Sequence, residues 1–320
     1  MGMEIMVSIV PDSLLVIIVT YNPDLQLLKK NILSLLEDGV TVYISDNDSK
    51  NIPDLQNTID SIDNRNIVLE LNKVNLGLAN AQNKGILYAL KKYFTYICFF
   101  DQDTVIPSEY ANNMLREYKV AENEVYPSRI GMLAPNYYDY RLKEYAHFAK
   151  LTKHSYLDVS IEKQHFLNVS FVVSSGSFIK TEVVKKIGLL KGKYFIDQID
   201  TEYSLRLLKN NYSIWVTSKV LLRHTIGNRD KKNLFGLTIK PNNHSALRKF
   251  YIFRNGIRTV KDYGVFFPGF RWLMFKRFIH DFLGVLFFED NKKKKIKAMY
   301  YGLKIGKLSI DNWSENEFFE

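Results

Sequence analysis

The sequence predicts an α/β protein with a mostly parallel central sheet flanked by helices. Four apolar, β-branched runs recur within the first hundred residues, and an amphipathic stretch follows each of the first three. Such an alternation requires right-handed crossovers, which place helices on the faces of a parallel sheet. Ligands bind beyond the carboxyl ends of strands in these sheets, so the residues directly after each run are the first candidates for a site.

The elements of the first half follow in a regular order. Residues 14–20 form a continuous apolar run, typical of a strand covered on both faces. A helix is expected to begin at Asn22-Pro23-Asp24 and to end at Gly39. The further expected strands cover residues 40–44, 67–71 and 96–100, and the further expected helices cover 52–62 and 78–92.

The alternation loosens beyond residue 130. Short strands are expected at 166–173, 177–180, 212–216 and 220–224, a helix at 200–208, and a helical, basic region from residue 243. The single cysteine, Cys98, excludes a disulfide framework and a multi-thiolate metal site. No uncharged apolar stretch approaches the roughly 20 residues of a membrane span, and the N-terminus lacks signal-peptide features, so we expect a cytoplasmic protein.

Charge is distributed unevenly along the chain, whose net charge is +10. Residues 223–308 hold 20 Lys and Arg against 5 Asp and Glu, and the rest of the chain is mildly acidic. A basic tail can attract nucleic acid, anionic lipid or a polyphosphate. A nucleic-acid-binding protein is the alternative from a different functional class, but no recognisable nucleic-acid module is present, and we expect no nucleic-acid partner.

Polar residues follow four successive expected strands and should converge on one crevice. An Asp-x-Asp pair can hold a divalent metal through oxygen ligands, although the pair is also common in solvated loops. The chain has neither a dinucleotide-binding glycine motif nor a P-loop, so a metal on Asp103 is the natural neutraliser of a diphosphate. These residues are Thr20, Tyr21 and Asn22; Asp46 and Asn47; Asn75, Gly77 and Asn83; and Asp101, Gln102 and Asp103.

A second acidic cluster contains Asp197, Asp200 and Glu202, with Arg206 one helical turn after Glu202. Clustered carboxylates repel one another, so they point to a catalytic use; the alternative is a helix cap by Asp200 beside an exposed ion pair. His224 follows an expected strand and could join Asp103 in a mixed oxygen and nitrogen metal site, or be an ordinary structural histidine.

In this order the motifs resemble the family 2 glycosyltransferases, which share the nucleotide-sugar-binding fold called GT-A. The resemblance spans about residues 14–260, and the variants at 100–104 and 195–202 are most similar to the rhamnosyltransferases of bacterial surface-polysaccharide synthesis. One departure is Ile199, where many relatives carry an acidic residue. The matching segments are residues 19–22, 46–49, 75–85, 101–103, 174–176, 195–206, 224–227, and Arg248 with Tyr251 and Arg254-Asn255.

The resemblance implies a role for each candidate. The nucleotide sugar would bind to the strand-end residues listed above up to Gln102, together with Arg254. Asp103 and His224 would hold Mg²⁺ or Mn²⁺, and Asp200 would be the catalytic base of an inverting transfer. The acceptor or sugar would lie near Ser175, Gly176, Asp197 and Glu202.

The implied activity is transfer of L-rhamnose from dTDP-rhamnose to a polyprenyl-diphosphate-linked saccharide in O-antigen or capsule synthesis. The alternative is a UDP-hexose-dependent enzyme of the same fold. Residues 1–240 would form the catalytic domain, with a nucleotide-binding half at about 14–104 and an acceptor half at about 105–240. Residues 241–320 would form a C-terminal helical region.

Aromatic and basic residues interleave between Val265 and Phe288, and the lysine cluster Lys292–Lys295 with Lys297 follows. This pattern is too charged to span a bilayer but is typical of a segment lying in its interface. We therefore expect peripheral association with the anionic inner face of the cell membrane. The alternative is that these aromatic residues pack on the body or form a homodimer contact.

Overall fold

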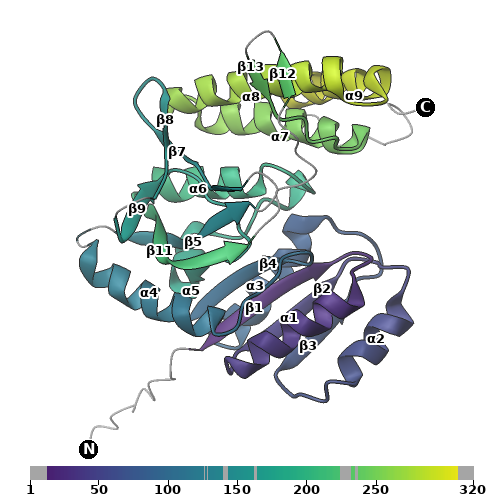
Figure 1. Cartoon of the computed structure of the whole chain (residues 1–320), viewed down its shortest axis with the longest axis vertical. Coiled ribbons are helices and arrows are strands. Elements are labelled where there is room, and N and C mark those ends of the chain that lie inside the picture. Colours follow the sequence, from purple (N-terminus) through teal and green to yellow (C-terminus); the bar gives the residue numbers. More distant parts are fainter. Residues whose placement is uncertain are drawn as a thin grey trace, which may run out of the picture.

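The computed structural model describes residues 13–125, 127, 129–139, 143–161, 164–223, 232–234 and 237–308. A mixed sheet of nine strands forms the centre of this part of the chain (Figure 1). Strands β1 to β4 are parallel, as the alternating pattern predicted. The spatial order is β3 (Ile67–Leu71), β2 (Thr41–Asp46), β1 (Leu14–Thr20), β4 (Tyr96–Asp101), β10 (Phe178–Lys180), β5 (Ile130–Asp139), β11 (Ser213–Arg223) and β9 (Phe166–Val169), with β6 (Glu144–Tyr145) beside β5.

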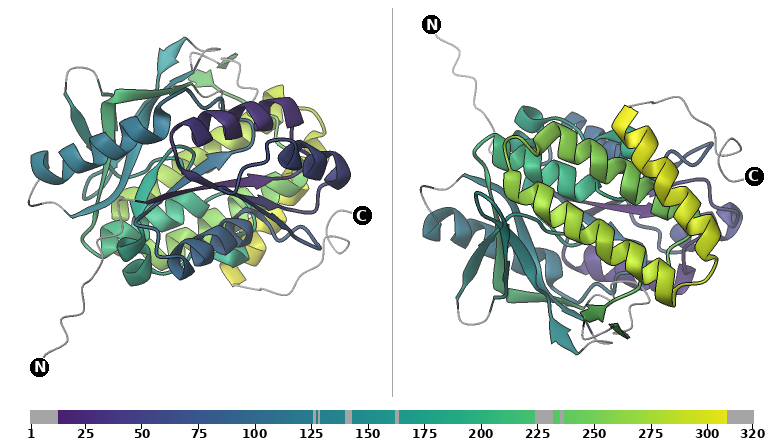
Figure 2. Two further views of the ribbon diagram at one scale, coloured as in Figure 1. Left: turned by 90° about the horizontal axis from the view of Figure 1, so that it is seen from below. Right: turned by 90° about the horizontal axis from the view of Figure 1, so that it is seen from above.

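Helices cover both faces of the parallel half. Asp24 caps the first helix by accepting hydrogen bonds from the backbone of Gln26 and Leu27. Helices α1 and α3 lie on opposite faces of the sheet (Figure 2), so the strands between them are buried on both sides. The helices up to residue 209 are α1 (Leu25–Glu37), α2 (Ile52–Asp60), α3 (Leu78–Lys91), α4 (Tyr110–Glu124), α5 (Thr181–Ile187) and α6 (Ile199–Lys209), with a short 3₁₀ turn at Gly192–Tyr194.

The second half differs from the expectation in three places. The strands expected at 212–216 and 220–224 are one strand, β11, interrupted by a register shift between Thr217 and Leu221. The strand expected over 166–173 ends at Val169. Strand β10 runs antiparallel between β4 and β5, a placement set by contacts between distant segments that local periodicity does not encode. Two hairpins complete this half: β7 (Phe148–Leu151) with β8 (Tyr156–Val159), and β12 (Lys232–Leu234) with β13 (Leu237–Ile239).

Three helices form a layer at the C-terminal side of the described chain: α7 (Ala246–Tyr263), α8 (Pro268–Phe288) and α9 (Lys292–Leu308). They lie side by side over one end of the molecule (Figure 2). None of the helices in the described ranges is long and apolar enough to cross a membrane.

A buried ion cluster joins these three helices. The Lys249 ammonium lies 3.1 Å from carboxylate oxygens of both Asp281 and Glu289, and Lys295 lies 2.9 Å from Glu289. The Glu289 and Lys249 side chains are fully buried. Lys295 was expected among the lysines that face an anionic membrane; for this residue the expectation is wrong, because its ammonium is buried and neutralises Glu289.

Candidate active site

The carboxyl ends of β1, β2 and β4 open into a cleft of about 1090 Å³, which α7 and α8 close on the other side. Ten of the predicted site residues line it, so the structure brings together most of the two clusters that the sequence singled out. These ten are Thr20, Tyr21, Asn47, Asn75, Gly77, Asp101, Gln102, Asp103, Asp197 and Asp200.

Asp46 stands behind the wall of the cleft. Its carboxylate is fully buried and accepts hydrogen bonds from the hydroxyls of Thr20 and Ser49, at 2.8 and 2.6 Å. The backbone N–H of Ser49 donates to the other oxygen. Asn22 is tied to the same turn, because its N–H donates to the Ser49 hydroxyl. Asp46 therefore links the end of β1 at Thr20 to the loop after β2, which carries Asn47 to the cleft.

Asn47 and Asn75 connect the β2 end to the start of α3. The Asn47 amide donates to the Asn75 side chain at 2.9 Å, and the same Asn75 oxygen accepts the backbone N–H of Gly77. Gly77 has a φ of +77°, and a Cβ there would stand 2.7 Å from the Cα of Phe195. Only glycine allows the α3 start and the Phe195 loop to approach so closely.

The Asp101-Gln102-Asp103 turn lies directly beside the end of β1. Gln102 accepts the backbone N–H of Tyr21 and donates to its carbonyl, at 2.7 and 3.1 Å. The Ser175 hydroxyl accepts the N–H of Asp101, so Ser175 supports the turn from behind. Asp103 is exposed, and no residue in the described part of the chain forms a hydrogen bond or ion pair with its carboxylate.

The donor set suits a divalent metal completed by a ligand. No group of three or more His, Cys, Asp or Glu gathers for a metal among the described residues. Two carboxylates leave most coordination positions to phosphate oxygens and water, as is usual for Mg²⁺ bound with a nucleotide. Asp103 is the unpartnered carboxylate that fits this role; His224, its expected companion, lies outside the described residues.

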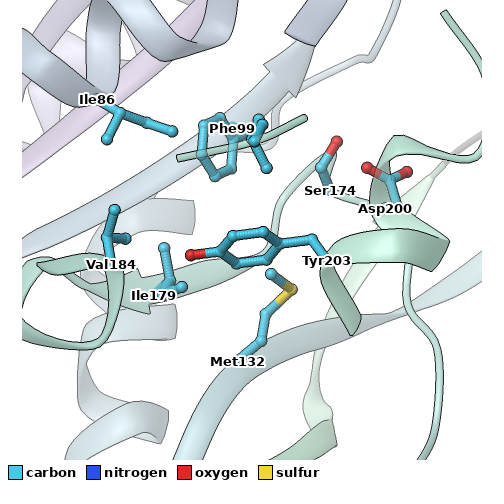
Figure 3. Close-up of a pocket in the computed structure, with 9 residues that line it drawn as sticks. Ile86, Phe99, Met132, Ser174, Ile179, Val184, Asp200 and Tyr203 are labelled. Atoms are coloured by element: carbon cyan, nitrogen blue, oxygen red, sulfur yellow. The ribbon is translucent and has the colours of Figure 1, made fainter. Parts of the chain in front are cut away.

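Asp200 lies where the cleft meets a small apolar cavity lined by Phe99, Met132 and Tyr203 (Figure 3). Burial raises the pKa of its carboxyl from an ordinary 3.8 to about 7, and the negative charge of Asp101 adds to the rise. Hydrogen bonds from Ser174 partly oppose this shift. A carboxylate with a pKa near neutrality is suited to accept a proton from a hydroxyl.

Asp200 does not cap its helix, as one alternative had it. Helix α6 begins at Ile199, and Gln198 precedes it with a φ of +62°. Phe195 and Asp197 also have positive φ, so three of the four residues from 195 to 198 have this conformation although none is glycine. Backbone strain of this kind persists only where surrounding contacts hold it, and it concentrates at functional sites.

The other two carboxylates of the cluster are already paired. Asp197 receives two hydrogen bonds from the Arg248 guanidinium, each 3.1 Å long. Glu202 is buried between Arg206, which binds it at 2.6 and 3.2 Å, and the Tyr263 hydroxyl at 2.7 Å. The predicted Glu202–Arg206 pair therefore exists, but it is buried rather than exposed. Asp200 is the carboxylate of the three that has no cationic partner among the described residues.

Helix α7 holds the strained loop in place. The Asn255 amide nitrogen lies 2.8, 2.9 and 3.0 Å from the carbonyl oxygens of Tyr194, Ile196 and Asp197. Arg254 is buried behind it, where its guanidinium stacks over the Tyr251 ring and donates to Asn255 at 3.0 Å. Arg254 therefore lies away from the cleft wall.

Two further predicted residues are in the scaffold. The Asn83 side chain donates to and accepts from the backbone of Leu190, at 2.9 Å each, and so ties α3 to the segment before the strained loop. Gly176 has a φ of +79°, and its carbonyl accepts the Tyr110 hydroxyl.

Sequence reasoning missed several residues on the cleft wall. Ser174 was part of a recognised motif, but only its neighbours Ser175 and Gly176 were assigned to the site. No local signal marks the Lys, Arg and His side chains that line the cleft from α8 and from the segment before α7, because they come from parts of the chain distant from the strand ends. These are Lys240, His244, Lys276, Arg277 and His280.

Comparison with known sequences agrees with the geometry. The sequence model of Glycosyl transferase family 2 matches residues 15–188, which contain the strand-end motifs. The dTDP-rhamnosyl transferase RfbF of Shigella flexneri is 30% identical over 247 residues, which cover 77% of this chain and 79% of that protein. The predicted resemblance to rhamnosyltransferases of this family is confirmed.

Solved structures share the fold at low sequence identity. The crystal structure of GalNAc-T7 with UDP, GalNAc and Mn²⁺ matches 78% of this chain with a TM-score of 0.56 and 13% identity, and the match spans 47% of that longer protein. The mannosyltransferase PcManGT from Pyrobaculum calidifontis, in complex with GDP-Man and Mn²⁺, matches 93% of this chain and 75% of its own, with a TM-score of 0.52 and 10% identity. The predicted GT-A fold is confirmed.

Proposed function

Because the chain belongs to glycosyl transferase family 2 and is a glycosyltransferase, we propose that it transfers L-rhamnose from dTDP-rhamnose with inversion of the anomeric configuration. The observation that carries the inverting mechanism is Asp200. Its carboxyl has a pKa of about 7, finds no cationic partner in the described part of the chain, and lies in the cleft with the nucleotide-side residues. The 30% identity to a dTDP-rhamnosyl transferase supports the donor.

In the proposed reaction Asp200 removes the proton from an acceptor hydroxyl. The hydroxyl oxygen forms a bond to the anomeric carbon, and the bond from that carbon to the diphosphate oxygen breaks on the opposite face. A single displacement inverts the configuration, so a β-linked donor gives an α-rhamnoside. General-base help of this type contributes about 10²–10⁴-fold to the rate.

The nucleotide would lie along Thr20, Tyr21, Asn47 and Asn75, beyond the ends of β1 and β2. Asp103, with Asp101 beside it, would hold Mg²⁺ or Mn²⁺, which stabilises the charge that develops on the departing diphosphate. The manganese in two structural neighbours and the unpartnered Asp103 carboxylate support this assignment.

The proposed acceptor is a saccharide on a polyprenyl diphosphate, in the synthesis of a cell-surface polysaccharide at the inner face of the cell membrane. The support is the resemblance to surface-polysaccharide rhamnosyltransferases and the cations Lys276 and Arg277 at the helical side of the cleft, which suit a second phosphate-bearing substrate. A UDP-hexose donor remains the second candidate, favoured by the UDP in GalNAc-T7.

The test is a donor screen with the purified chain. Calorimetry with dTDP and UDP in the presence of Mn²⁺, followed by hydrolysis of dTDP-rhamnose and UDP-hexoses, should show a preference for the thymidine nucleotide and release of rhamnose. Tighter binding of UDP together with hydrolysis of a UDP-hexose would reject the donor assignment and leave the glycosyltransferase assignment standing.

A further inference from the structure

Helix α8 is apolar on two opposite faces. Its inner face packs into the protein through Phe270, Leu273, Met274 and Val285, all of which are buried. A second apolar stripe faces away from these residues. It consists of Trp272, Phe275, Ile279, Phe282 and Leu286, which we call the outer stripe.

The outer stripe follows the helical repeat. Its members recur at spacings of three, four, three and four residues, so they share one side of the helix over about 21 Å. Phe275 is 54% exposed and Ile279 is 45% exposed, although large apolar side chains are usually covered. The Trp272 and Phe275 rings stack on each other at 5.6 Å, which keeps this surface aromatic and flat. A continuous exposed apolar stripe marks an interaction surface.

Positive charge surrounds the outer stripe. Arg271 and Lys276 are exposed on the same helix, and the Lys276 ammonium lies 5.2 Å from the centre of the Trp272 ring. Lys292, Lys293 and Lys294 are exposed at the start of α9, directly after the end of α8. Exposed aromatic residues flanked by basic ones are the combination that binds the interface of an anionic bilayer, whereas a protein partner of like composition would be repelled.

We propose that the outer stripe of α8 docks on an anionic membrane, with the helix lying in the plane of the interface. The reason for docking rests on the proposed function, whereas the experiment that tests docking does not depend on it. Lys276 contributes both to the surroundings of the stripe and to the wall of the cleft, together with Arg277 and Phe278. The outer stripe faces away from Leu273 and Met274, which line the cleft, so docking would place α8 between the lipid surface and the cleft. The cleft would then lie about one helix diameter, roughly 10 Å, from the surface where a lipid-linked acceptor carries its diphosphate.

The structure also changes which basic residues can take part. Lys295 is buried against Glu289, so it is unavailable to lipid, and the other four members of the cluster, Lys292, Lys293, Lys294 and Lys297, are exposed. Helix α8 supplies the apolar contact and these lysines supply attraction. Salt should weaken binding through the lysines, and removal of the stripe should abolish it at any ionic strength.

The experiment is vesicle flotation of the full chain without donor or acceptor. Wild type should float with phosphatidylcholine vesicles containing about a third phosphatidylglycerol and stay at the bottom with pure phosphatidylcholine. The double variant F275S/I279S should lose at least about tenfold in partitioning. The triple variant K292Q/K293Q/K294Q should bind more weakly and depend less steeply on salt, because Arg271, Lys276 and Lys297 remain. The matched control L33S/Y93S removes two exposed apolar residues elsewhere and should float like wild type.

Each alternative gives a distinct result. Wild type that fails to float with anionic vesicles at low salt would overturn the proposal, as would F275S/I279S that floats normally. A wild-type dimer in light scattering that F275S/I279S converts to a monomer would assign the stripe to a second copy of the chain. Thermal melting and hydrolysis of the donor by the variants check that they fold. Because flotation needs no substrate, loss of docking and loss of the proposed activity are separable.

Discussion

Replacing Asp200 with Asn would separate the catalytic and the energetic effects of its buried carboxylate. Asn preserves the size and shape of the side chain but cannot accept a proton. Turnover should therefore fall at least about 10²-fold, while dTDP binding measured by calorimetry persists. In wild type, kcat/KM should rise about tenfold per pH unit below pH 7 and level off above it, since only the carboxylate form is active.

The same pKa shift predicts that Asp200→Asn is more stable than wild type above about pH 7. The sign follows from proton linkage. Below the ordinary pKa of 3.8 the carboxyl is protonated in both folded and unfolded chains and contributes nothing. As pH rises towards 7 the unfolded chain releases its proton first, so the folded state loses stability. A shift from 3.8 to about 7 corresponds to a penalty of at most about 4 kcal/mol above pH 7, reduced by the contact of Asp200 with the open cleft.

Urea denaturation at about pH 5 and about pH 8 measures this penalty. Asp200→Asn should be more stable than wild type at the higher pH, and the difference should shrink at the lower pH. Asp103→Asn is the matched control, because Asp103 is an exposed carboxylate in the same cleft and its replacement should change stability little at either pH. A difference that does not grow with pH would refute the buried-charge reasoning, and near-normal turnover would refute the assignment of Asp200 as the base.

Three further predictions concern the metal, the strained loop and the helical layer. Asp103→Ala should abolish the gain in dTDP affinity that Mn²⁺ confers in calorimetry, and metal-independent binding by wild type would contradict this role. Gly77→Ala should lower both Tm and turnover, because its Cβ would collide with Phe195. Gly39→Ala is the control, since nothing lies within 4 Å of its Cβ. Equal effects of the two substitutions would contradict the collision. Glu289→Gln should cost about 3–5 kcal/mol in urea denaturation, because it leaves the buried Lys295 without its carboxylate and Lys249 with Asp281 alone. A loss under about 1 kcal/mol would show that the cluster relaxes.

Local patterns predicted the first half of the fold because each element there carries its own signal. The Asp24 cap, the Gly39 end and the four parallel strands follow from cap chemistry and apolar periodicity alone. The second half depends on distant pairing. The interruption expected between 216 and 220 corresponds to a register shift in β11. The strand continues past it because β11 pairs with β5 on both sides of the shift, and no local pattern predicts that pairing.

The site divides in the same way. Residues after parallel strands could be assigned because the carboxyl ends of such strands share one edge, and Asp101 and Asp103 do lie together with Asn47 there. The relation among Asp197, Asp200 and Glu202 was predictable only in part. Helical spacing gives the Glu202–Arg206 pair, but no local pattern shows that Asp197 also receives a cation. Arg248, which pairs with Asp197, and Tyr263, which donates to Glu202, both come from α7. This helix begins 47 residues after α6 begins, so only tertiary packing places these partners.

The hydrogen bonds from Asn255 to the loop before Asp200 matter for the construction of chimeric enzymes. One amide on α7 fixes three carbonyl groups of that loop, and the buried charges of Lys249, Glu289 and Lys295 fix α7 against α8 and α9. In a chimera that takes the nucleotide-binding half from one relative and α7–α9 from another, the two parts would therefore meet at the contact that also positions Asp200. Chimeras that exchange residues 194–202 together with α7–α9 should keep the Asn255 contacts intact. Chimeras whose boundary lies at the start of α7 should not.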